Sequence, residues 1–193
     1  MPFPPHPFYF IRHGETDWNR QGTYMGKTDI PLNDLGRRQA AHAALTLKNE
    51  PITHIVTSPL LRAHETATII AEVIQKPVHI VEDLHEFNLG EAGKQSLDLG
   101  FFERWLAGET PEGAESVEEL DARILGAVTQ ALTFPGPVLI VSHGGVYHSL
   151  RRLLKGESPG FVKNCTVFHH APHPSSSWLF EEIGDTPLSE AGI

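Results

Sequence analysis

An arginine and a histidine stand directly behind a short apolar run near the start of the chain. Phe8-Tyr9-Phe10-Ile11 combines aromatic and β-branched side chains and predicts a buried strand, from whose end Arg12 and His13 emerge. The planar guanidinium of arginine matches the oxygens of a phosphate group, and a neutral imidazole is a nucleophile near physiological pH. This pair of residue types at a strand end therefore indicates phosphoryl chemistry.

Two later segments repeat this arrangement of an apolar strand followed by a basic or imidazole side chain. The apolar run at 55–56 precedes Arg62, and the run at 138–141 precedes His143. In an open α/β sheet, ligands bind outside the carboxyl ends of the strands, so we expect the three segments to meet at one ligand. The helix expected after His143 would add free backbone N–H groups and a positive dipole end, both of which suit an anion.

The rest of the chain alternates strand and helix patterns that can hold these residues at one edge of a sheet. Expected strands cover residues 8–12, 54–57, 78–81, 137–142, 165–169 and 177–182, and expected helices cover 34–48, 59–75, 95–107, 115–133 and 146–154. Asn33 is expected to cap the helix over 34–48. Its apolar face is expected to carry Leu35, Ala41 and Leu45. The alternation predicts the α/β class, as a three-layer α/β/α sandwich with a mostly parallel central sheet.

Length and composition favour one enzyme domain and exclude several other classes. The 193 residues suffice for a full core, so residues 1–193 are treated as a single domain. The net charge of −9 does not suit a nucleic-acid partner, and no apolar run is long enough to cross a membrane. The start of the chain at 2–7 is rich in proline and lacks the features of a secretory signal. Cys165 is the only cysteine, which fits a reducing cytoplasm, and we expect it as a buried thiol in the strand over 165–169.

Taken together, the polar segments resemble the histidine phosphatase superfamily, in its phosphoglycerate mutase-like phosphatase branch. The resemblance rests on Arg-His-Gly-Glu-Thr at 12–16, Ser-Pro-Leu-x-Arg-Ala-x-x-Thr-Ala at 58–67 and Ser-His-Gly-Gly at 142–145, in the family's order. Weaker matches are Pro31-Leu32, Gly36, Gln39-Ala40 and Glu115-Ser116. The resemblance runs from about Tyr9 to about Phe168, and it implies a phosphoglycerate mutase-like fold with a small lid insertion at about 87–136.

The resemblance also implies roles for individual side chains. His13 matches the nucleophile that takes the phosphoryl group, and Glu86 matches the general acid and base. The expected phosphate-binding set is Arg12, Asn19, Arg62, His143 and the backbone N–H of Gly144. In phosphoryl transfer, positioning and fixed charge do most of the catalysis, so Arg12, Arg62 and His143 also count as catalytic. No metal and no resident cofactor are expected.

One segment departs from the family pattern, on the side of the leaving group. Many phosphatases of the group follow the acid with Gly-x-Trp-Glu-Gly, whereas this chain has Ala92 and Gly93 at the tryptophan and glutamate positions. Apolar and aromatic side chains elsewhere are candidates for a pocket wall on that side, because ligand pockets mix such groups with a few polar ones. These candidates are Trp18, Tyr24, Met25, Phe87, Phe101, Phe102 and Trp105.

Three functions remain compatible with these residues. The first is a phosphatase for a small phosphate monoester, the second a phosphoglycerate mutase primed by 2,3-bisphosphoglycerate, and the third a non-catalytic phospho-ligand-binding protein. A mutase needs lid cations for a second phosphate and a carboxylate, and the lid provides only Lys94, Arg104 and Arg123. Because helical i,i+4 pairing is the simpler explanation of Arg123, we favour the phosphatase. A small-molecule phosphate ester is then the expected partner, and a homodimer is the commonest form if the chain assembles.

The histidine-rich segment near the end of the chain raises the question of a metal site. His169, His170 and His173 lack the i,i+4 pair with a glutamate that a zinc helix shows, and solvated imidazoles are expected instead. Arg12 and Arg62 would also repel a cation from the histidines of the phosphate pocket.

Overall fold

Six strands form one sheet in the computed structural model, which describes residues 2–90, 92, 100–155, 160–175 and 177–184. In chain order they are β1 (Phe8–Arg12), β2 (His54–Thr57), β3 (Val78–Ile80), β4 (Val138–Ser142), β5 (Val167–Pro172) and β6 (Trp178–Ile183). Their spatial order is β3-β2-β4-β1-β5-β6. The four strands from β3 to β1 are parallel, whereas β5 and β6 are antiparallel to their neighbours. The expected mostly parallel sheet is confirmed.

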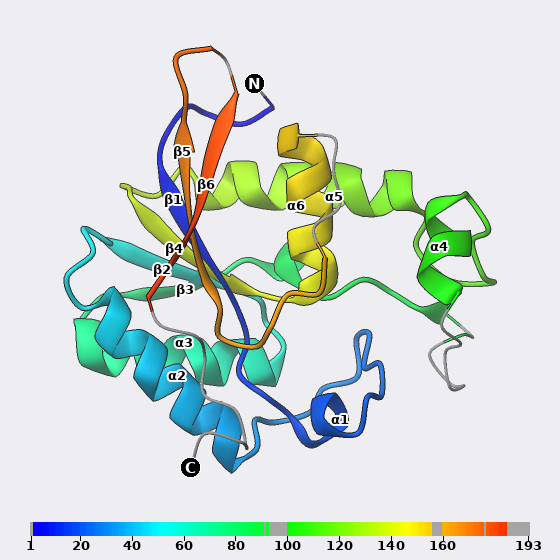
Figure 1. The fold of residues 1–193 in the computed structure, drawn as a ribbon, viewed down its shortest axis with the longest axis horizontal. Coiled ribbons are helices and arrows are strands. Elements are labelled where there is room, and N and C mark those ends of the chain that lie inside the picture. Colours follow the sequence, from blue (N-terminus) through cyan, green and yellow to red (C-terminus); the bar gives the residue numbers. More distant parts are fainter. Residues whose placement is uncertain (1, 91, 93–99, 156–159, 176, 185–193) are drawn as a thin grey trace.

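Helices cover both faces of this sheet. They are α1 (Asp17–Arg20), α2 (Asp34–Leu47), α3 (Leu61–Ile74), α4 (Phe101–Leu106), α5 (Val117–Ala131) and α6 (Gly144–Lys155), with a 3-10 turn, η1, at Glu82–Leu84. Helices α2 and α3 lie together on one side of the sheet, and α5 and α6 lie on the other (Figure 1).

Two apolar cores result, one on each side of the sheet. Because successive strand residues point to opposite faces, Phe8 and Phe10 of β1 enter the core with α5 and α6, whereas Tyr9 and Ile11 enter the core with α2 and α3. Every residue of β4 is buried, as expected for a central parallel strand covered on both faces. This is the predicted three-layer α/β/α sandwich.

Helix α2 shows where the sequence pattern was correct and where it misled. The Asn33 side chain accepts a hydrogen bond from the Gly36 N–H at 2.8 Å, so the predicted cap is confirmed. Leu35 is buried as expected, but Ala41 and Leu45 are exposed, so that part of the predicted apolar face was wrong. The buried face instead carries Leu35, Gly36, Gln39, Ala40, Ala43, Ala44 and Leu47. Small side chains let α2 approach α3 closely, which outweighs the preference for burying one leucine.

Several element boundaries also differ from the sequence-based expectation. Helix α3 begins at Leu61 rather than in the first turn after Ser58, and the four-residue α1 was not expected at all. Strand β5 begins after Cys165 and continues to Pro172, so Cys165 is buried in the preceding turn, at a φ of 55°, and not in the strand. Residues 95–99 of the helix expected over 95–107 lie outside the described part of the chain.

The segment expected to form a lid has two different parts. Helix α5 packs through Leu120, Ile124 and Val128 into the core beside the sheet, whereas α4 stands at the far end of α5, away from the sheet (Figure 1). Among the described residues, none of the helices is long and apolar enough to span a membrane.

Candidate active site

The polar ends of three strands meet at the carboxyl edge of the sheet. Arg12 of β1 pairs in register with Ser142 of β4, and the His13 N–H donates to the Ser142 carbonyl at 2.9 Å. The Ser58 N–H, after β2, donates to the carbonyl of Val141 in β4 at 3.1 Å. Because β1, β4 and β2 are neighbours, the three segments that sequence analysis singled out lie side by side.

His13 has the geometry of a neutral nucleophile. Its side chain is 2 % exposed, and its Nδ1 lies 2.7 Å from the Gly14 carbonyl oxygen. A carbonyl oxygen only accepts, so Nδ1 must carry the proton and Nε2 keeps its lone pair. Burial, reinforced by the charges of Arg62 and Arg12, lowers the pKa of His13 well below its usual value. The imidazole is therefore neutral at pH 7 and has a free nitrogen for attack.

His143 lies beside His13 and is fully buried. The two ring centroids are 5.2 Å apart, and His143 Nε2 lies 2.7 Å from the Ser58 hydroxyl oxygen. Burial first, and then Arg62 and His13, lower the pKa of His143 well below its usual value. Its Nδ1 is buried without a hydrogen-bond partner among the described residues. Ser58 was not proposed as a site residue, although it opens the second matching segment.

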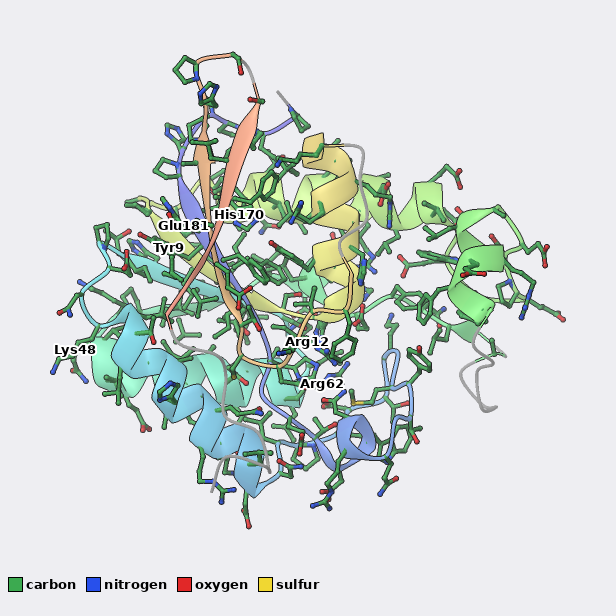
Figure 2. The ribbon with its side chains drawn as sticks, viewed as in Figure 1. Tyr9, Arg12, Lys48, Arg62, His170 and Glu181 are labelled. Carbon is green, nitrogen blue, oxygen red and sulfur yellow. The ribbon has the colours of Figure 1, made fainter. Side chains whose placement is uncertain are left out.

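Arg12 and Arg62 place two guanidinium groups at this edge (Figure 2). Arg62 is fully buried, and its Nη1 and Nη2 donate to the carbonyls of Thr28 and Gly26 at 2.8 and 2.9 Å. Arg12 donates through Nη1 to the carbonyl of Val162. Burial lowers the pKa of Arg62 to about 10, which leaves it charged at neutral pH.

Each guanidinium still has an unused donor. The Nε of Arg12 and the Nε of Arg62 are buried and have no hydrogen-bond partner in the described part of the chain. An unsatisfied buried N–H costs about 1–3 kcal/mol, and more for a charged group. An anion that accepts from these donors would remove that cost.

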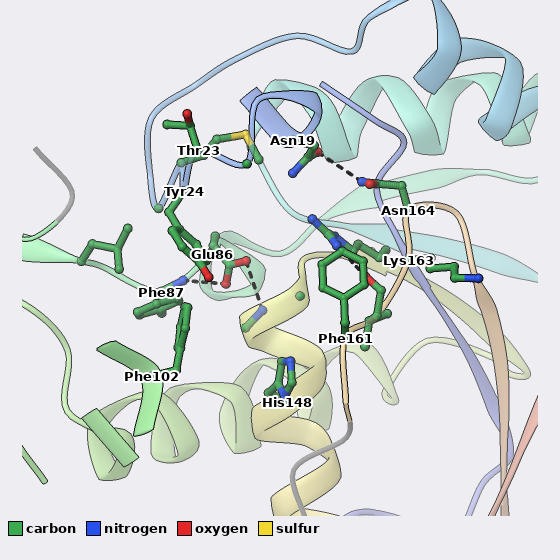
Figure 3. Close-up of a pocket in the computed structure, with 18 of the residues that line it drawn as sticks. Asn19, Thr23, Tyr24, Glu86, Phe87, Phe102, His148, Phe161, Lys163 and Asn164 are labelled. Atoms are coloured by element: carbon green, nitrogen blue, oxygen red, sulfur yellow. Dashed lines mark hydrogen bonds between the residues drawn. The ribbon is translucent and has the colours of Figure 1, made fainter. Parts of the chain in front are cut away.

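A pair of asparagines closes another side of the pocket. The Asn19 carbonyl oxygen accepts from the Thr16 N–H and from the Asn164 amide, each at 3.2 Å (Figure 3). The Asn164 amide also donates to the His13 carbonyl at 2.9 Å. Since its oxygen is engaged, Asn19 is left with its amide donors for an anion. Asn164 follows a long gap in the sequence and was not anticipated.

Glu86 sits against the first turn of α6. Its Oε1 accepts from the Phe87 N–H at 2.9 Å, and its Oε2 accepts from the Gly145 N–H at 3.1 Å (Figure 3). A Cβ at Gly145 would lie 2.3 Å from Oε1, so the carboxylate needs a glycine there. Gly144, the first residue of α6, lines the cavity beside Arg12.

A buried ion pair fixes the backbone on both sides of Glu86. Arg123 and Glu115 pair at 2.7 Å, with side chains only 12 % and 18 % exposed. Arg123 Nη1 donates to the carbonyls of Asp83 and His85, and the Glu115 carboxylate accepts from the N–H of Asn88 at 2.8 Å. The i,i+4 explanation of Arg123 was therefore wrong, because its partner lies outside the helix.

Close backbone contacts and one side-chain hydrogen bond account for two of the weaker family matches, Gly36 and Gln39 in α2. A Cβ at Gly14 would lie 2.5 Å from the Gly36 carbonyl oxygen, and a Cβ at Gly36 would lie 2.1 Å from the Glu15 carbonyl oxygen. The Glu15 N–H also donates to the Gln39 side chain at 2.9 Å. These contacts hold the turn after His13 directly against α2.

A cavity of about 860 Å³ opens in front of these groups. Of the proposed site residues, Arg12, Asn19, Arg62, Glu86 and Gly144 line it. His13 and His143 are buried and do not belong to its lining. The structure thus brings all the proposed site residues into one region but leaves the two histidines almost covered.

Some of the aromatic and apolar side chains expected to line the cavity do so, and others do not. Tyr24, Met25, Phe87, Phe102 and Trp105 line the cavity, together with the unexpected Phe161. Phe101 packs into the core instead, and Trp18 does not reach the lining. Ala92 packs against the same core as Phe101, whereas Gly93 and Lys94 lie outside the described residues.

The basic side chains that line the cavity are not the lid cations considered in the sequence. Arg104 and Arg123 do not line it, whereas Arg20, His148, Arg152 and Lys163 do. His148 and Arg152 are four residues apart on α6, a spacing that puts both on one helix face. That periodicity was visible in the sequence, but nothing in it showed which face of α6 meets the cavity.

The C-terminal histidines do not converge. His170 is fully buried and stacks on Phe8 at 4.6 Å between ring centroids, so its predicted exposure to solvent was wrong. His169 stacks on Tyr9 on the other sheet face, and His173 lies 2.8 Å from the Ser175 hydroxyl oxygen. Within the described ranges, no group of three or more histidine, cysteine or acidic side chains is arranged to hold a metal ion.

Comparisons with known proteins agree with this geometry. Residues 8–186 match the histidine phosphatase superfamily (branch 1). The chain is 34 % identical over 204 residues to a probable phosphoglycerate mutase GpmB of Cronobacter sakazakii, covering 95 % of this chain and 94 % of that one. It is 38 % identical over 151 residues to an uncharacterized phosphatase PhoE of Bacillus subtilis, covering 77 % of each.

Two solved structures show how similar the fold is. A mycobacterial glucosyl-3-phosphoglycerate phosphatase has a TM-score of 0.76 at 28 % identity, over 92 % of this chain and 97 % of that one. YhfR of Bacillus stearothermophilus has a TM-score of 0.82 at 27 % identity, over 94 % and 98 %. The chain belongs to the histidine phosphatase superfamily.

Proposed function

We propose that the protein is a metal-independent phosphatase that hydrolyses a phosphate monoester through a phosphohistidine on His13. One observation is the main support for this proposal. The free Nε2 of a neutral His13 lies in the same buried region as two guanidinium groups whose Nε donors have no partner among the described residues. A phosphoryl group bound at this edge would meet the nucleophile and two positive charges at once.

In the first step, His13 Nε2 attacks the phosphorus atom and the bond to the leaving oxygen breaks. Glu86, in its protonated form, gives its proton to that oxygen, because an alkoxide is otherwise a poor leaving group. In the second step, Glu86 takes a proton from water, the resulting hydroxide attacks the phosphorus, and the P–N bond breaks. Inorganic phosphate leaves and His13 returns to its neutral form.

The charges that stabilise this reaction belong to the protein. Arg12, Arg62 and the amide donors of Asn19 face the negative charge that the transferring group spreads over its oxygens. His143 is held neutral by its burial, and its unpartnered Nδ1 is a further polar group beside His13. No step requires a metal or a cofactor.

The phosphatase is favoured over the mutase by the charges around the leaving group. A mutase must hold a second phosphate and a carboxylate. Arg152 already pairs with Asp121, and Arg20 pairs with Asp17 at 2.9 Å. Arg123 of the lid, whose side chain is 12 % exposed, is held by Glu115. In the described part of the lining these pairings leave Lys163, on an exposed position, for a second anion, which is too little for both a phosphate and a carboxylate.

The decisive experiment measures phosphate release from a panel of phosphate monoesters in EDTA, for the wild type and for His13→Ala. We expect release in EDTA from the wild type and a loss of at least about 10⁴-fold in the variant, as for the removal of a nucleophile. Activity that survives in His13→Ala would rule out the phosphohistidine. If no ester is hydrolysed, turnover of phosphoglycerate primed with 2,3-bisphosphoglycerate would identify a mutase instead.

The role of Glu86 is tested by Glu86→Gln with two kinds of ester. Alkyl phosphates should slow by about 10²–10⁴-fold, because the alcohol needs a proton to leave. Aryl phosphates should lose much less in the first step, since an aryl oxide leaves unaided. Pre-steady-state kinetics should be used, so that the second step does not mask the first. Equal slowing of both esters would contradict the role of Glu86 as the acid.

A further inference from the structure

The cavity is much larger than a phosphoryl group needs. Its volume of about 860 Å³ falls in the range of pockets that enclose whole drug-sized ligands. Only its inner end carries the phosphate-binding groups Arg12, Asn19 and Arg62. The remainder must face the alcohol part of the substrate, so its chemistry determines which leaving groups fit.

Four aromatic side chains form one continuous surface of this outer part. We call Tyr24, Phe87, Phe102 and Trp105 the aromatic wall. Ring centroids in it are 5.0 Å apart for Tyr24 and Phe102, 5.9 Å for Phe87 and Phe102, and 5.1 Å for Phe87 and Trp105. These are ordinary packing distances for aromatic rings, so the wall is a single apolar patch.

Phe161 faces this wall from another part of the chain. Figure 3 shows Phe161 on one side of the cavity and Tyr24 and Phe102 on the other, with Glu86 between them. The Phe161 side chain is 83 % exposed, more than any other large apolar side chain in the described residues. Because Phe161 lines the cavity opposite the aromatic wall, its exposed ring is available to a ligand that enters there.

The position of Phe161 is tied to the phosphate site. Its ring centroid lies 5.5 Å from Cζ of Arg12, and the carbonyl of the next residue, Val162, accepts a hydrogen bond from Arg12. A ring held between Phe161 and the aromatic wall would therefore lie at a fixed place relative to the phosphorus atom.

The outer part of the cavity carries little net charge. Arg152 is paired with Asp121, and burial, with the nearby charges of Arg152 and Arg12, lowers the pKa of His148 to about 4. His148 is therefore neutral at pH 7. Lys163 is a cation of the lining, but it lies on an exposed position where solvent screens its charge. An anionic leaving group would gain little here, whereas an uncharged ring would bury apolar surface on both sides.

We propose that Phe161 and the aromatic wall form a leaving-group site for an uncharged aromatic ring. The preferred substrates are then phosphate monoesters whose alcohol carries such a ring, and phosphorylated small acids are poor substrates. The proposal rests on the proposed phosphatase function, and it makes Phe161 and Phe102 specificity-determining residues.

The test compares benzyl phosphate with ethyl phosphate, because their alcohols are of similar acidity and differ in the ring. We expect kcat/KM to favour benzyl phosphate by about tenfold to a hundredfold, as expected for burying a phenyl group. Phe161→Ala and, separately, Phe102→Ala should each remove most of this preference. Leu45→Ala, which removes an exposed apolar side chain on α2, is the matched control and should keep it. A ratio near one in the wild type, or better turnover of 3-phosphoglycerate, would overturn the proposal.

Binding of phosphonates separates this proposal from the proposed function. Benzylphosphonate and methylphosphonate cannot be hydrolysed, so calorimetry measures the site even if the protein releases no phosphate from any ester. Tighter binding of benzylphosphonate, lost in Phe161→Ala, would support the site while the phosphatase proposal failed. Equal affinities for the two phosphonates would overturn the site itself.

Discussion

The inner and outer ends of the cavity are built in opposite ways. At the inner end, His13, Arg62 and His143 are 2 %, 0 % and 0 % exposed, and each is bonded to backbone or to a buried hydroxyl. At the outer end, Tyr24 and Phe161 are 42 % and 83 % exposed and come from loops. The inner end follows three adjacent parallel strands, whereas the outer end is built from loops and from α4.

This difference follows from what each end must do. Fixed charges stabilise a transition state best where they are dry and cannot rearrange, and a sheet edge with helices on both faces provides such a place. Recognition of an alcohol group requires apolar area and shape, which loops can vary without disturbing the scaffold. The two ends should therefore respond differently to mutation.

Among changes that leave the inner and outer groups themselves in place, the largest effect is expected at the junction of the two ends, in Gly145→Ala. The new Cβ would lie 2.3 Å from Glu86 Oε1 and 2.8 Å from a ring carbon of Phe87, so the flexible carboxylate must move. We expect kcat for alkyl phosphates to fall by about 10²–10³-fold, while aryl phosphates fall less. Steady-state kinetics on both esters measures this.

Gly144→Ala is the matched control for that prediction. A Cβ there meets nothing closer than Arg12 Nε at 3.8 Å, so the loss should be far smaller. Equal losses in the two variants would mean that helix α6 itself, rather than the position of Glu86, is disturbed.

The second effect concerns the ion pair that fixes Glu86. Arg123→Met leaves the Glu115 carboxylate buried without its cation, and breaking such a pair costs about 3 kcal/mol of unfolding free energy. We also expect kcat for alkyl phosphates to fall about tenfold, because the backbone on both sides of Glu86 loses its anchor. Urea unfolding and kinetics measure the two effects.

A double variant sharpens this second prediction. Adding Glu115→Gln removes the uncompensated charge while an amide oxygen remains for the Asn88 N–H, so stability should recover in part. If stability recovers while kcat stays low, Arg123 is a positioning residue. If the single variant is as stable as the wild type, the pair does not hold this loop.

The smallest effect is a loss of stability in acid, carried by buried histidines. Burial lowers the pKa of His13, His143 and His170, the last to about 3. As pH falls below about 6.5, these histidines become protonated in the unfolded chain but stay neutral in the folded protein. The unfolding free energy should therefore fall, by at most about 1.4 kcal/mol per pH unit for each of these histidines.

His170→Phe is the variant that tests this source of acid sensitivity. His170 stacks on Phe8 with rings only 1° from parallel, and it is fully buried among Phe8, Tyr147 and Phe180, so a phenyl ring suits the site. Urea unfolding at pH 7 and pH 5 should show a smaller difference for this variant than for the wild type. An unchanged difference would show that His170 does not resist protonation.

Local sequence signals were sufficient to predict the layers of the fold and the residues that lie at the strand ends. Short apolar runs such as 8–11 and 138–141 fix where strands form and end, and the order of elements limits which strands can be neighbours. The buried face of α2 was harder to predict, because alanine fits either face of a helix. Whether Ala40 or Ala41 is buried depends on how close α3 lies.

What the sequence determined by itself is the inner end: Arg12, His13, Arg62 and His143 follow strands that a parallel sheet must bring together at one edge. Only the tertiary structure decided the rest. Asn164 contacts His13 across 151 positions, Arg123 holds the backbone at Asp83, and Phe161 faces Tyr24 across the cavity. Such contacts depend on how whole segments pack, and no local periodicity records which distant side chain will occupy a given space.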